Sequence, residues 1–393
     1  MRPGSLAEIA GCEPRRFFDQ YFEKQALRVS RNDPAYFGSL LSLQDIDKYI
    51  TTKPVQYPEI FLVNAEREIK AAEYTGSGDA IDPVSLYKLH ADGATIVLNQ
   101  FQRAHPALAE LCARLELEFS APFQANIYLT PPRARGFKAH FDTHDVFILQ
   151  IHGAKQWRLY STPVELPLSG QGKEALQEDP GVPRQEIELR AGDTLYIPRG
   201  LVHDAPSLDE TSLHVTVGIL SYTWSDLLLE VLANAVLGDA AFRRALPHDL
   251  LRADFDREAA RRVFRDLLAS FSGSADPDAA LDSFAQEFIH SRRPRVHDQL
   301  AQLKSLRDLT VSSIVGQRTA LAYTLDEDPS GTRLECYGNQ IRFPQAAGNA
   351  VRYALTHPEF RVGDLPDLDD SGKLVLVRRL IREGILVQRE DVS

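Results

Sequence analysis

His140 and Asp142 form a His-x-Asp pair, and both side-chain types bind divalent metal ions. They open the segment 140–160, HFDTHDVFILQIHGAKQWRLY, which predicts an apolar strand, a turn at Gly153 and a second strand. Residues i and i+2 of a strand point to the same side, with their backbones about 7 Å apart. One cation can therefore contact both side chains. A second histidine would complete the two-histidine, one-carboxylate set that suits non-haem Fe(II) and leaves coordination positions open.

Three later histidines, His144, His203 and His214, are candidates for the remaining ligand. His144 lies about 13 Å along the predicted strand from His140. Joint ligation by these two is hard because metal–nitrogen bonds measure about 2 Å. His203 follows the Pro-Arg-Gly turn at 198–200, where a bulged strand can turn a side chain inward, whereas His214 lies on the polar face of a regular strand. On the residues alone, His203 and His214 are nearly equal candidates.

Short alternating strands are predicted on both sides of this segment. Residues 124–130 and 212–219 each place apolar side chains on one face and polar side chains on the other. Between them, residues 186–199 predict a strand, a turn and another strand. Antiparallel strands separated by turns favour a sandwich or barrel. If the polar faces point inward, this barrel encloses a polar cavity next to the His-x-Asp pair.

The run from Asn126 to Thr216 resembles the JmjC-type 2-oxoglutarate oxygenases, specifically their ribosomal-oxygenase branch. The matching segments, which share the family's order and spacing, are NIYLTPP (126–132), HFDTHDVFILQIHGAKQWRLY (140–160), AGDTLYIPRGLVH (191–203) and SLHVTVG (212–218). The resemblance implies an α+β fold with N-terminal α/β elements and a double-stranded β-helix core of the cupin or jelly-roll type. It also implies that His203 is the third metal ligand beside His140 and Asp142.

Lys155 matches the family's basic residue that pairs with the distal carboxylate of 2-oxoglutarate. This dicarboxylate chelates a metal through its keto-acid end and needs a cation at the other end. Tyr128 and Asn126 match positions that line the co-substrate pocket, and Thr216 is a further candidate. The loop 133–139 departs from the Gly/Pro-rich approach that is usual before the metal motif. We expect this loop to border the substrate groove, so the resemblance does not identify the substrate.

The composition of the whole chain excludes several classes of protein. With 393 residues, 44% hydrophobic and 25% charged, the chain is typical of a globular protein of two or three domains. A net charge of -11 argues against bulk nucleic-acid binding. The three cysteines are widely spaced and predict neither a zinc ribbon nor a disulfide framework. With no apolar run of about 18 residues and no signal-peptide pattern at the N-terminus, we expect a cytoplasmic protein without a membrane partner.

We expect three domains: an oxygenase domain at 1–222, a helical domain at 223–309 and a winged-helix-like domain at 310–393. Helical patterns fill most of 224–309, and a hairpin, two helices and a closing strand follow. The resemblance implies that the helical domain mediates dimerisation, which predicts a homodimer. Acidic and basic side chains nearly balance in the last module, so it is not expected to bind DNA.

The predicted protein is an oxygenase that uses Fe(II), 2-oxoglutarate and O₂ to hydroxylate a protein side chain. The resemblance points to a histidine or arginine of a ribosomal protein. Two alternatives are a hydroxylase of a peptide natural-product precursor or small molecule, and a non-catalytic cupin-type module that holds a metal. An intact triad with Lys155 argues against the last, because a structural metal site needs no cation for a co-substrate. A lysine demethylase is a weaker alternative, since no histone-reading module is predicted.

Overall fold

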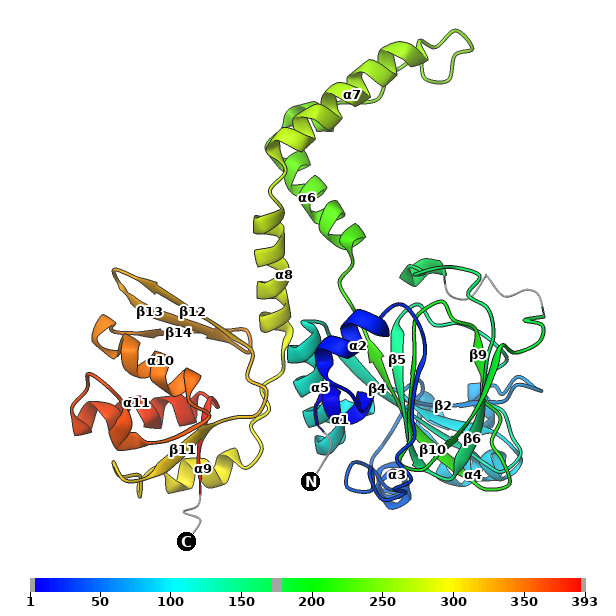
Figure 1. Ribbon diagram of the computed structural model, residues 1–393, viewed down its shortest axis with the longest axis horizontal. Helices are drawn as coiled ribbons and strands as arrows, with labels where there is room; N and C mark the ends of the chain where they lie inside the picture. Colours follow the sequence, from blue (N-terminus) through cyan, green and yellow to red (C-terminus); the bar gives the residue numbers. More distant parts are fainter. Residues whose placement is uncertain (1–3, 172–178, 390–393) are drawn as a thin grey trace. The chain divides into compact units, whose positions relative to one another are not determined.

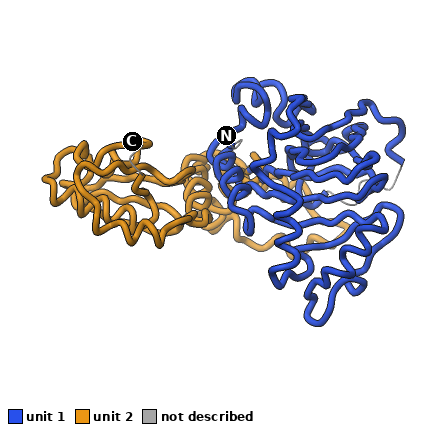
Figure 2. The backbone as a smooth tube through the Cα atoms, turned by 90° about the horizontal axis from the view of Figure 1, so that it is seen from below, with its two compact units in different colours: residues 1–221 blue, residues 222–393 orange. Residues whose placement is uncertain are grey.

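The computed structural model describes residues 4–171 and 179–389, in two compact units, Met1–Ser221 and Tyr222–Ser393 (Figure 2). Both units combine helices with antiparallel sheets, so the predicted α+β class is confirmed. In the described part of the chain, no helix is both long enough and apolar enough to cross a membrane.

Two antiparallel sheets form the centre of the first unit (Figure 1). Their strands are β1 (Leu27–Val29), β2 (Ile60–Val63), β3 (Thr95–Leu98), β4 (Phe123–Thr130), β5 (Asp145–His152), β6 (Ala154–Leu159), β7 (Gln185–Arg190), β8 (Thr194–Ile197), β9 (His203–Asp204) and β10 (Ser212–Ile219). The larger sheet has the order β1-β8-β5-β10-β4-β3-β2, and the smaller one the order β7-β6-β9. Apolar side chains of β5 and β8, such as Val146 and Leu195, pack on Trp157 and Ile187 of the smaller sheet. The two sheets therefore enclose a common interior.

Helices cover the outer face of the larger sheet. They are α1 (Leu6–Ala10), α2 (Pro14–Gln20), α3 (Leu43–Thr52), α4 (Pro83–Ala91) and α5 (Pro106–Phe119). Phe17 of α2 and Leu108 of α5 join the same buried cluster as Ile127 of β4 and Phe147 of β5. Burial of this apolar layer against water holds the helices on the sheet. It also leaves the opposite face of β4, β5 and β10 for the interior of the sandwich.

The polar face of the alternating strands points into this interior. The pairing of β10 with β4 places His214 opposite Tyr128 and Thr216 opposite Asn126. The apolar residues of both strands belong to the outer cluster, as the period of two requires. The predicted polar interior is thus present, and β4, β6 and β10 deliver side chains to it.

The second unit contains helices followed by small sheets. Its elements are α6 (Trp224–Gly238), α7 (Arg257–Ser274), α8 (Pro277–Ser291), α9 (Gln299–Ser305), β11 (Ile314–Gln317), β12 (Tyr323–Asp328), β13 (Gly331–Cys336), β14 (Asn339–Phe343), α10 (Gly348–Thr356), β15 (Glu359–Arg361), α11 (Asp370–Arg382) and β16 (Leu386–Gln388). Strands β12, β13 and β14 form one sheet, and β15, β11 and β16 form another. Helices α10 and α11 contribute Val351 and Leu380 to a buried cluster with Val315 and Leu334, which gives this part of the unit its own core.

Candidate metal centre

His140 and His203 lie directly opposite each other although they are far apart in the sequence. The backbone N–H of His140 donates to the carbonyl of His203 at 3.1 Å, and the reverse hydrogen bond measures 2.8 Å. This pairing is an isolated antiparallel bridge, and His140 is not part of a longer strand. The expected strand through His140 and Asp142 is therefore wrong in detail, because β5 begins only at Asp145. The two imidazoles are neighbours, with their ring centroids 4.7 Å apart and their planes tilted by 53°.

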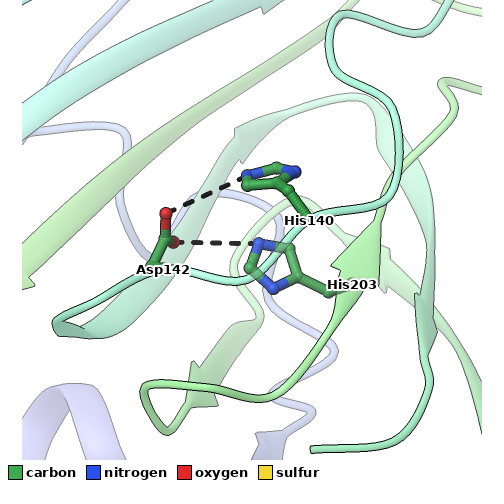
Figure 3. Close-up of side chains that lie close together, drawn as sticks. All are labelled: His140, Asp142 and His203. Carbon is green, nitrogen blue, oxygen red and sulfur yellow. Dashed lines mark ion pairs between the residues drawn. The ribbon is translucent and has the colours of Figure 1, made fainter. Parts of the chain in front are cut away.

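Asp142 completes a compact triad with these two histidines (Figure 3). One ligand atom from each of the three residues lies within 4.8 Å of the other two. The carboxylate Oδ1 lies 3.9 Å from Nε2 of His140, and Oδ2 lies 3.8 Å from Nε2 of His203. These three donors converge on one point, which is the arrangement that a shared cation requires.

Backbone carbonyls set the orientation of both imidazoles. Nδ1 of His140 lies 2.8 Å from the carbonyl oxygen of Lys138, and Nδ1 of His203 lies 3.0 Å from that of Leu201. A carbonyl can only accept, so in each neutral ring Nδ1 carries the proton and Nε2 keeps its lone pair. Burial, with the neighbouring His140 as a smaller cause, lowers the pKa of His203 to about 4 and keeps this ring neutral. Both features are typical of metal-binding histidines, so the donor set fits a divalent metal.

The Pro-Arg-Gly turn positions the backbone of the triad. The N–H of Gly200 donates to the carbonyl of Asp142 at 2.9 Å. Gly200 has a φ of +86°, and a Cβ there would lie 2.3 Å from the carbonyl oxygen of Val164. Only glycine fits this position without strain. Phe141 and Val202 pack together on the far side of the bridge, which directs the neighbouring triad side chains to the interior.

Asp204, the residue after His203, fixes the short strand β9. Its side chain is 1% exposed and accepts hydrogen bonds from Nε of Arg158 at 2.7 Å and from Nη1 of Arg135 at 3.0 Å. The Tyr160 hydroxyl donates a further one at 3.2 Å. The arginines come from β6 and from the loop before His140, so this carboxylate connects three segments around the triad. The sequence analysis did not identify Asp204, whose partners lie far from it in sequence.

A cavity of about 560 Å³, including its open mouth, adjoins the triad. The three triad residues line it. So do three of the four side chains predicted to bind the co-substrate, namely Tyr128, Lys155 and Thr216. The wall also contains His214, which the sequence analysis weighed as a metal ligand, and Trp157, Phe137 and Thr95, which it did not select. The alternation of Lys155 and Trp157 on β6 was a usable signal, since residues two apart share a face.

Lys155 is a buried cation without a counter-charge in the described part of the chain. It is 4% exposed, and burial lowers its pKa to about 7. Tyr128 is half-buried, and desolvation of its hydroxyl raises its pKa, so the phenol stays protonated. A lysine and a phenol that share a cavity can both donate to a carboxylate.

Asn126 does not line this cavity, unlike the other predicted co-substrate residues. Its carboxamide oxygen accepts from the backbone N–H of Gln100 at 2.9 Å, and its side chain also bonds to Tyr128. Asn126 therefore contacts Tyr128 on the same face of β4 without lining the cavity itself.

The two rejected ligand candidates lie outside the triad. His214 is buried, with its ring stacked on Tyr128 at a centroid distance of 4.8 Å, and its Nδ1 has no hydrogen-bond partner in the described residues. Burial, and secondarily the nearby Lys155, lower its pKa well below the ordinary value. His144 lies against Gly218, where an added Cβ would be 2.8 Å from its Nε2.

Comparison with known proteins agrees with this architecture. Residues 97–227 match the JmjC domain family. The chain is 33% identical over 298 residues to a Culex quinquefasciatus protein named bifunctional lysine-specific demethylase and histidyl-hydroxylase NO66, covering 71% of this chain and 45% of that protein. It is 30% identical over 438 residues to rat (Rattus norvegicus) ribosomal oxygenase 1, covering 97% of this chain and 71% of that protein. It thus spans less than half of the mosquito relative.

Solved structures share the fold. Escherichia coli ycfD aligns over 96% of this chain and 98% of its own, with a TM-score of 0.55 and 17% identity. A second structure of the E. coli protein, the ribosomal oxygenase YcfD in complex with cobalt and 2-oxoglutarate, aligns over 96% of this chain and 98% of its own, with a TM-score of 0.51 and 16% identity. The whole-length match to ribosomal oxygenase 1, together with the JmjC domain, shows that the chain belongs to the ribosomal-oxygenase branch of the JmjC family of 2-oxoglutarate oxygenases.

Proposed function

We propose that this chain is an Fe(II)- and 2-oxoglutarate-dependent oxygenase that hydroxylates a side chain of a ribosomal protein, a histidine or an arginine. One observation carries the proposal: a triad of metal-binding side chains and a buried, unpaired lysine share one cavity. A structural metal site would have no use for that lysine, because burying a cation without a partner is costly. A co-substrate with a carboxylate at its far end explains both features.

His140, Asp142 and His203 would hold the metal through Nε2, a carboxylate oxygen and Nε2. The backbone carbonyls that accept from the two Nδ1 atoms keep the imidazoles aimed at this point before any ion binds. When bound, iron with 2-oxoglutarate and O₂ supplies an oxidation that converts the co-substrate to succinate and CO₂ and adds one oxygen atom to a substrate C–H bond. The exposed fractions of the side chains of His140 and Asp142, 38% and 28%, leave the triad open on one side for substrate.

Lys155 would bind the distal carboxylate of 2-oxoglutarate. The incoming negative charge offsets the cost of burying the ammonium and keeps it protonated. Tyr128, protonated, would donate a second hydrogen bond, and Thr216 a third. Asn126 would orient the Tyr128 hydroxyl, since its side chain bonds to it.

The protein substrate is supported by the names of the relatives, ribosomal oxygenase 1 and bifunctional lysine-specific demethylase and histidyl-hydroxylase NO66. A net charge of -11 also suits a basic partner such as a ribosomal protein. The loop 133–139 lies at the cavity, with Gly136 and Phe137 in its wall, so it would contact the substrate.

Succinate release in the presence of Fe(II), ascorbate and 2-oxoglutarate tests the reaction. His140→Ala and Lys155→Ala should abolish it, while exposed counterparts, His248→Ala and Lys48→Ala, should not. Iron-loaded protein that neither binds nor consumes 2-oxoglutarate would establish the non-catalytic cupin alternative.

The substrate is tested by mass spectrometry of ribosomal proteins from cells with and without the gene. The loss of one oxygen atom from a histidine or arginine in the deletion strain is the expected result. Turnover of 2-oxoglutarate with an unchanged ribosomal proteome would favour a peptide natural-product precursor or a small molecule as substrate.

We further propose that residues 223–309 form a dimerisation domain and that residues 310–393 form a winged-helix-like domain without a nucleic-acid partner. Large apolar side chains of α6 and α7 are exposed to solvent in the single chain, namely Trp224, Leu228, Leu229, Leu237, Val263, Phe264 and Leu268. So much exposed apolar surface on two helices favours an interface between copies. Light scattering should give the mass of a dimer, and Leu229→Glu should reduce it to that of a monomer. A wild-type monomer at micromolar concentration would contradict the proposal.

A further inference from the structure

Phe137 is an exposed aromatic side chain at the mouth of the cavity. It is 38% exposed, whereas Trp157, an aromatic residue of the same cavity wall, is only 5% exposed. Its ring centroid lies 5.5 Å from that of His140 and 6.2 Å from that of Tyr128. Phe137 is therefore next to both the proposed metal ligand and the proposed co-substrate residue, with part of its ring exposed.

The loop that carries Phe137 is fixed by the two residues immediately before it, Arg135 and Gly136. The N–H of Ala65, next to β2, donates to the carbonyl of Arg135 at 2.9 Å. A Cβ at position 136 would lie 3.0 Å from Oγ1 of Thr95, so the loop packs closely on the start of β3. The Arg135 guanidinium is held by the buried carboxylate of Asp204 at 3.0 Å. A ring on a fixed loop is pre-organised for binding, because little conformational entropy is lost when a partner packs on it.

The charged groups of the cavity wall are all engaged elsewhere. Asp142 belongs to the proposed metal site, and Asp204 is neutralised by Arg135 and Arg158. Lys155 would serve the co-substrate. No carboxylate of the described wall is thus left to select a substrate side chain by its charge. Selection at the mouth has to come from shape and from the aromatic surface.

We infer that Phe137 determines specificity by stacking on a planar substrate side chain, an imidazole or a guanidinium, beside the metal. The inference rests on the proposed function and adds to it the residue that selects the side chain. Tyr128 meets the Phe137 ring edge-on, at an interplanar angle of 71°, so a second planar group can approach the part that remains exposed. Planar heteroaromatic and guanidinium groups gain stacking or cation–π attraction there, which an aliphatic side chain of equal size does not gain.

Binding without turnover tests this inference. The probes are four peptides with identical glycine–lysine flanks and a central His, Arg, Leu or Lys. Their dissociation constants are measured by calorimetry on the full chain, loaded with Co(II) and 2-oxoglutarate. The variants are Phe137→Leu, which keeps an apolar side chain and removes the ring, and Phe137→Tyr, which keeps the ring.

In the wild-type protein the His and Arg peptides should bind more tightly than the Leu and Lys peptides. Phe137→Leu should weaken only the His and Arg peptides, by about two- to tenfold, the range of a single aromatic contact. Phe137→Tyr should bind the His and Arg peptides as tightly as the wild-type protein does. Equal binding of all four peptides to the wild-type protein, or an equal loss of all four in Phe137→Leu, would overturn the inference.

A separate titration of 2-oxoglutarate distinguishes this outcome from failure of the proposed function. Wild-type protein with Co(II) that does not bind 2-oxoglutarate refutes the proposed function itself. If Phe137→Leu alone loses 2-oxoglutarate affinity, the ring supports the metal site and does not select the substrate, which also overturns the inference.

Discussion

Replacing Lys155 by methionine should stabilise the ligand-free protein while it abolishes co-substrate binding. Burial lowers the pKa of Lys155 from the ordinary 10.5 to about 7. In the unfolded chain this lysine regains its ordinary pKa, so between pH 7 and 10 the unfolded state binds more protons than the folded one. The protonated lysine therefore opposes folding fully below pH 7, and its effect fades as pH rises toward 10.5. At 1.36 kcal/mol per pKa unit the cost approaches about 5 kcal/mol, an upper limit because water entering the cavity reduces it.

Thermal melts of the ligand-free protein at pH 6.5 measure this effect. Lys155→Met keeps the length and the apolar stem of the side chain without the charge, so it should raise the Tm by several degrees. An exposed lysine of α3, Lys48, gives the matched control Lys48→Met, which should change Tm little. The difference in free energy of unfolding between wild-type protein and Lys155→Met should shrink as pH rises from 7 toward 10. A lower Tm for Lys155→Met at pH 6.5 would refute the account of Lys155 as an unpaired buried cation.

Three further predictions concern the same cavity. Above pH 7 the affinity of the metal-loaded protein for 2-oxoglutarate should fall by up to about tenfold per pH unit, because Lys155 loses its proton. Calorimetry measures this affinity, and a constant affinity up to pH 9 would contradict the role of Lys155. Asp204→Asn should weaken Co(II) binding about 10- to 100-fold, read from the visible spectrum, whereas the exposed Asp209→Asn should not; equal affinities would exclude a positioning role for Asp204. Gly200→Ala should lower the free energy of unfolding by more than about 2 kcal/mol, because a Cβ would lie 2.3 Å from the carbonyl oxygen of Val164. Urea unfolding measures this change, and a variant with the same urea midpoint as the wild-type protein would show that the turn accommodates the added Cβ.

The parts of the fold with a regular pattern could be read from the sequence. The expected strands at 124–130 and 212–219 correspond to β4 (Phe123–Thr130) and β10 (Ser212–Ile219), because alternation is a local property of a strand with one buried face. The conformation around His140 could not be predicted in the same way. Its backbone makes a single bridge to His203, a contact set by the turn at 198–200 and by packing of Phe141. Such pairing depends on residues far apart in sequence.

The choice between His203 and His214 shows the same limit. Both side chains are buried, at 5% and 3% exposed, and both lie on strands that line one cavity. Their difference is one of place: β9 sets His203 opposite His140, whereas β10 sets His214 opposite Tyr128 and near Lys155. Strand pairing of this kind is not encoded in the residues next to either histidine, so only the family resemblance separated them. Asn126 was selected by the same resemblance, yet in the structure its side chain bonds to the backbone of Gln100 and to Tyr128 and does not line the cavity.

The charges of the cavity bear on the order in which its proposed ligands bind. Burial keeps His203 and His214 neutral. Asp142 and Lys155 are then the two charged groups of the cavity that would bind the proposed ligands, and they would contact opposite ends of the co-substrate. A divalent cation and a protonated Lys155 carry three positive charges, and Asp142 with a 2-oxoglutarate dianion carries three negative ones. The filled cavity is therefore neutral. Without the metal, the dianion would meet the carboxylate of Asp142 at its keto-acid end, and these like charges repel each other. Metal binding should therefore precede 2-oxoglutarate binding, and the two affinities should be coupled positively and by equal factors, as linkage requires.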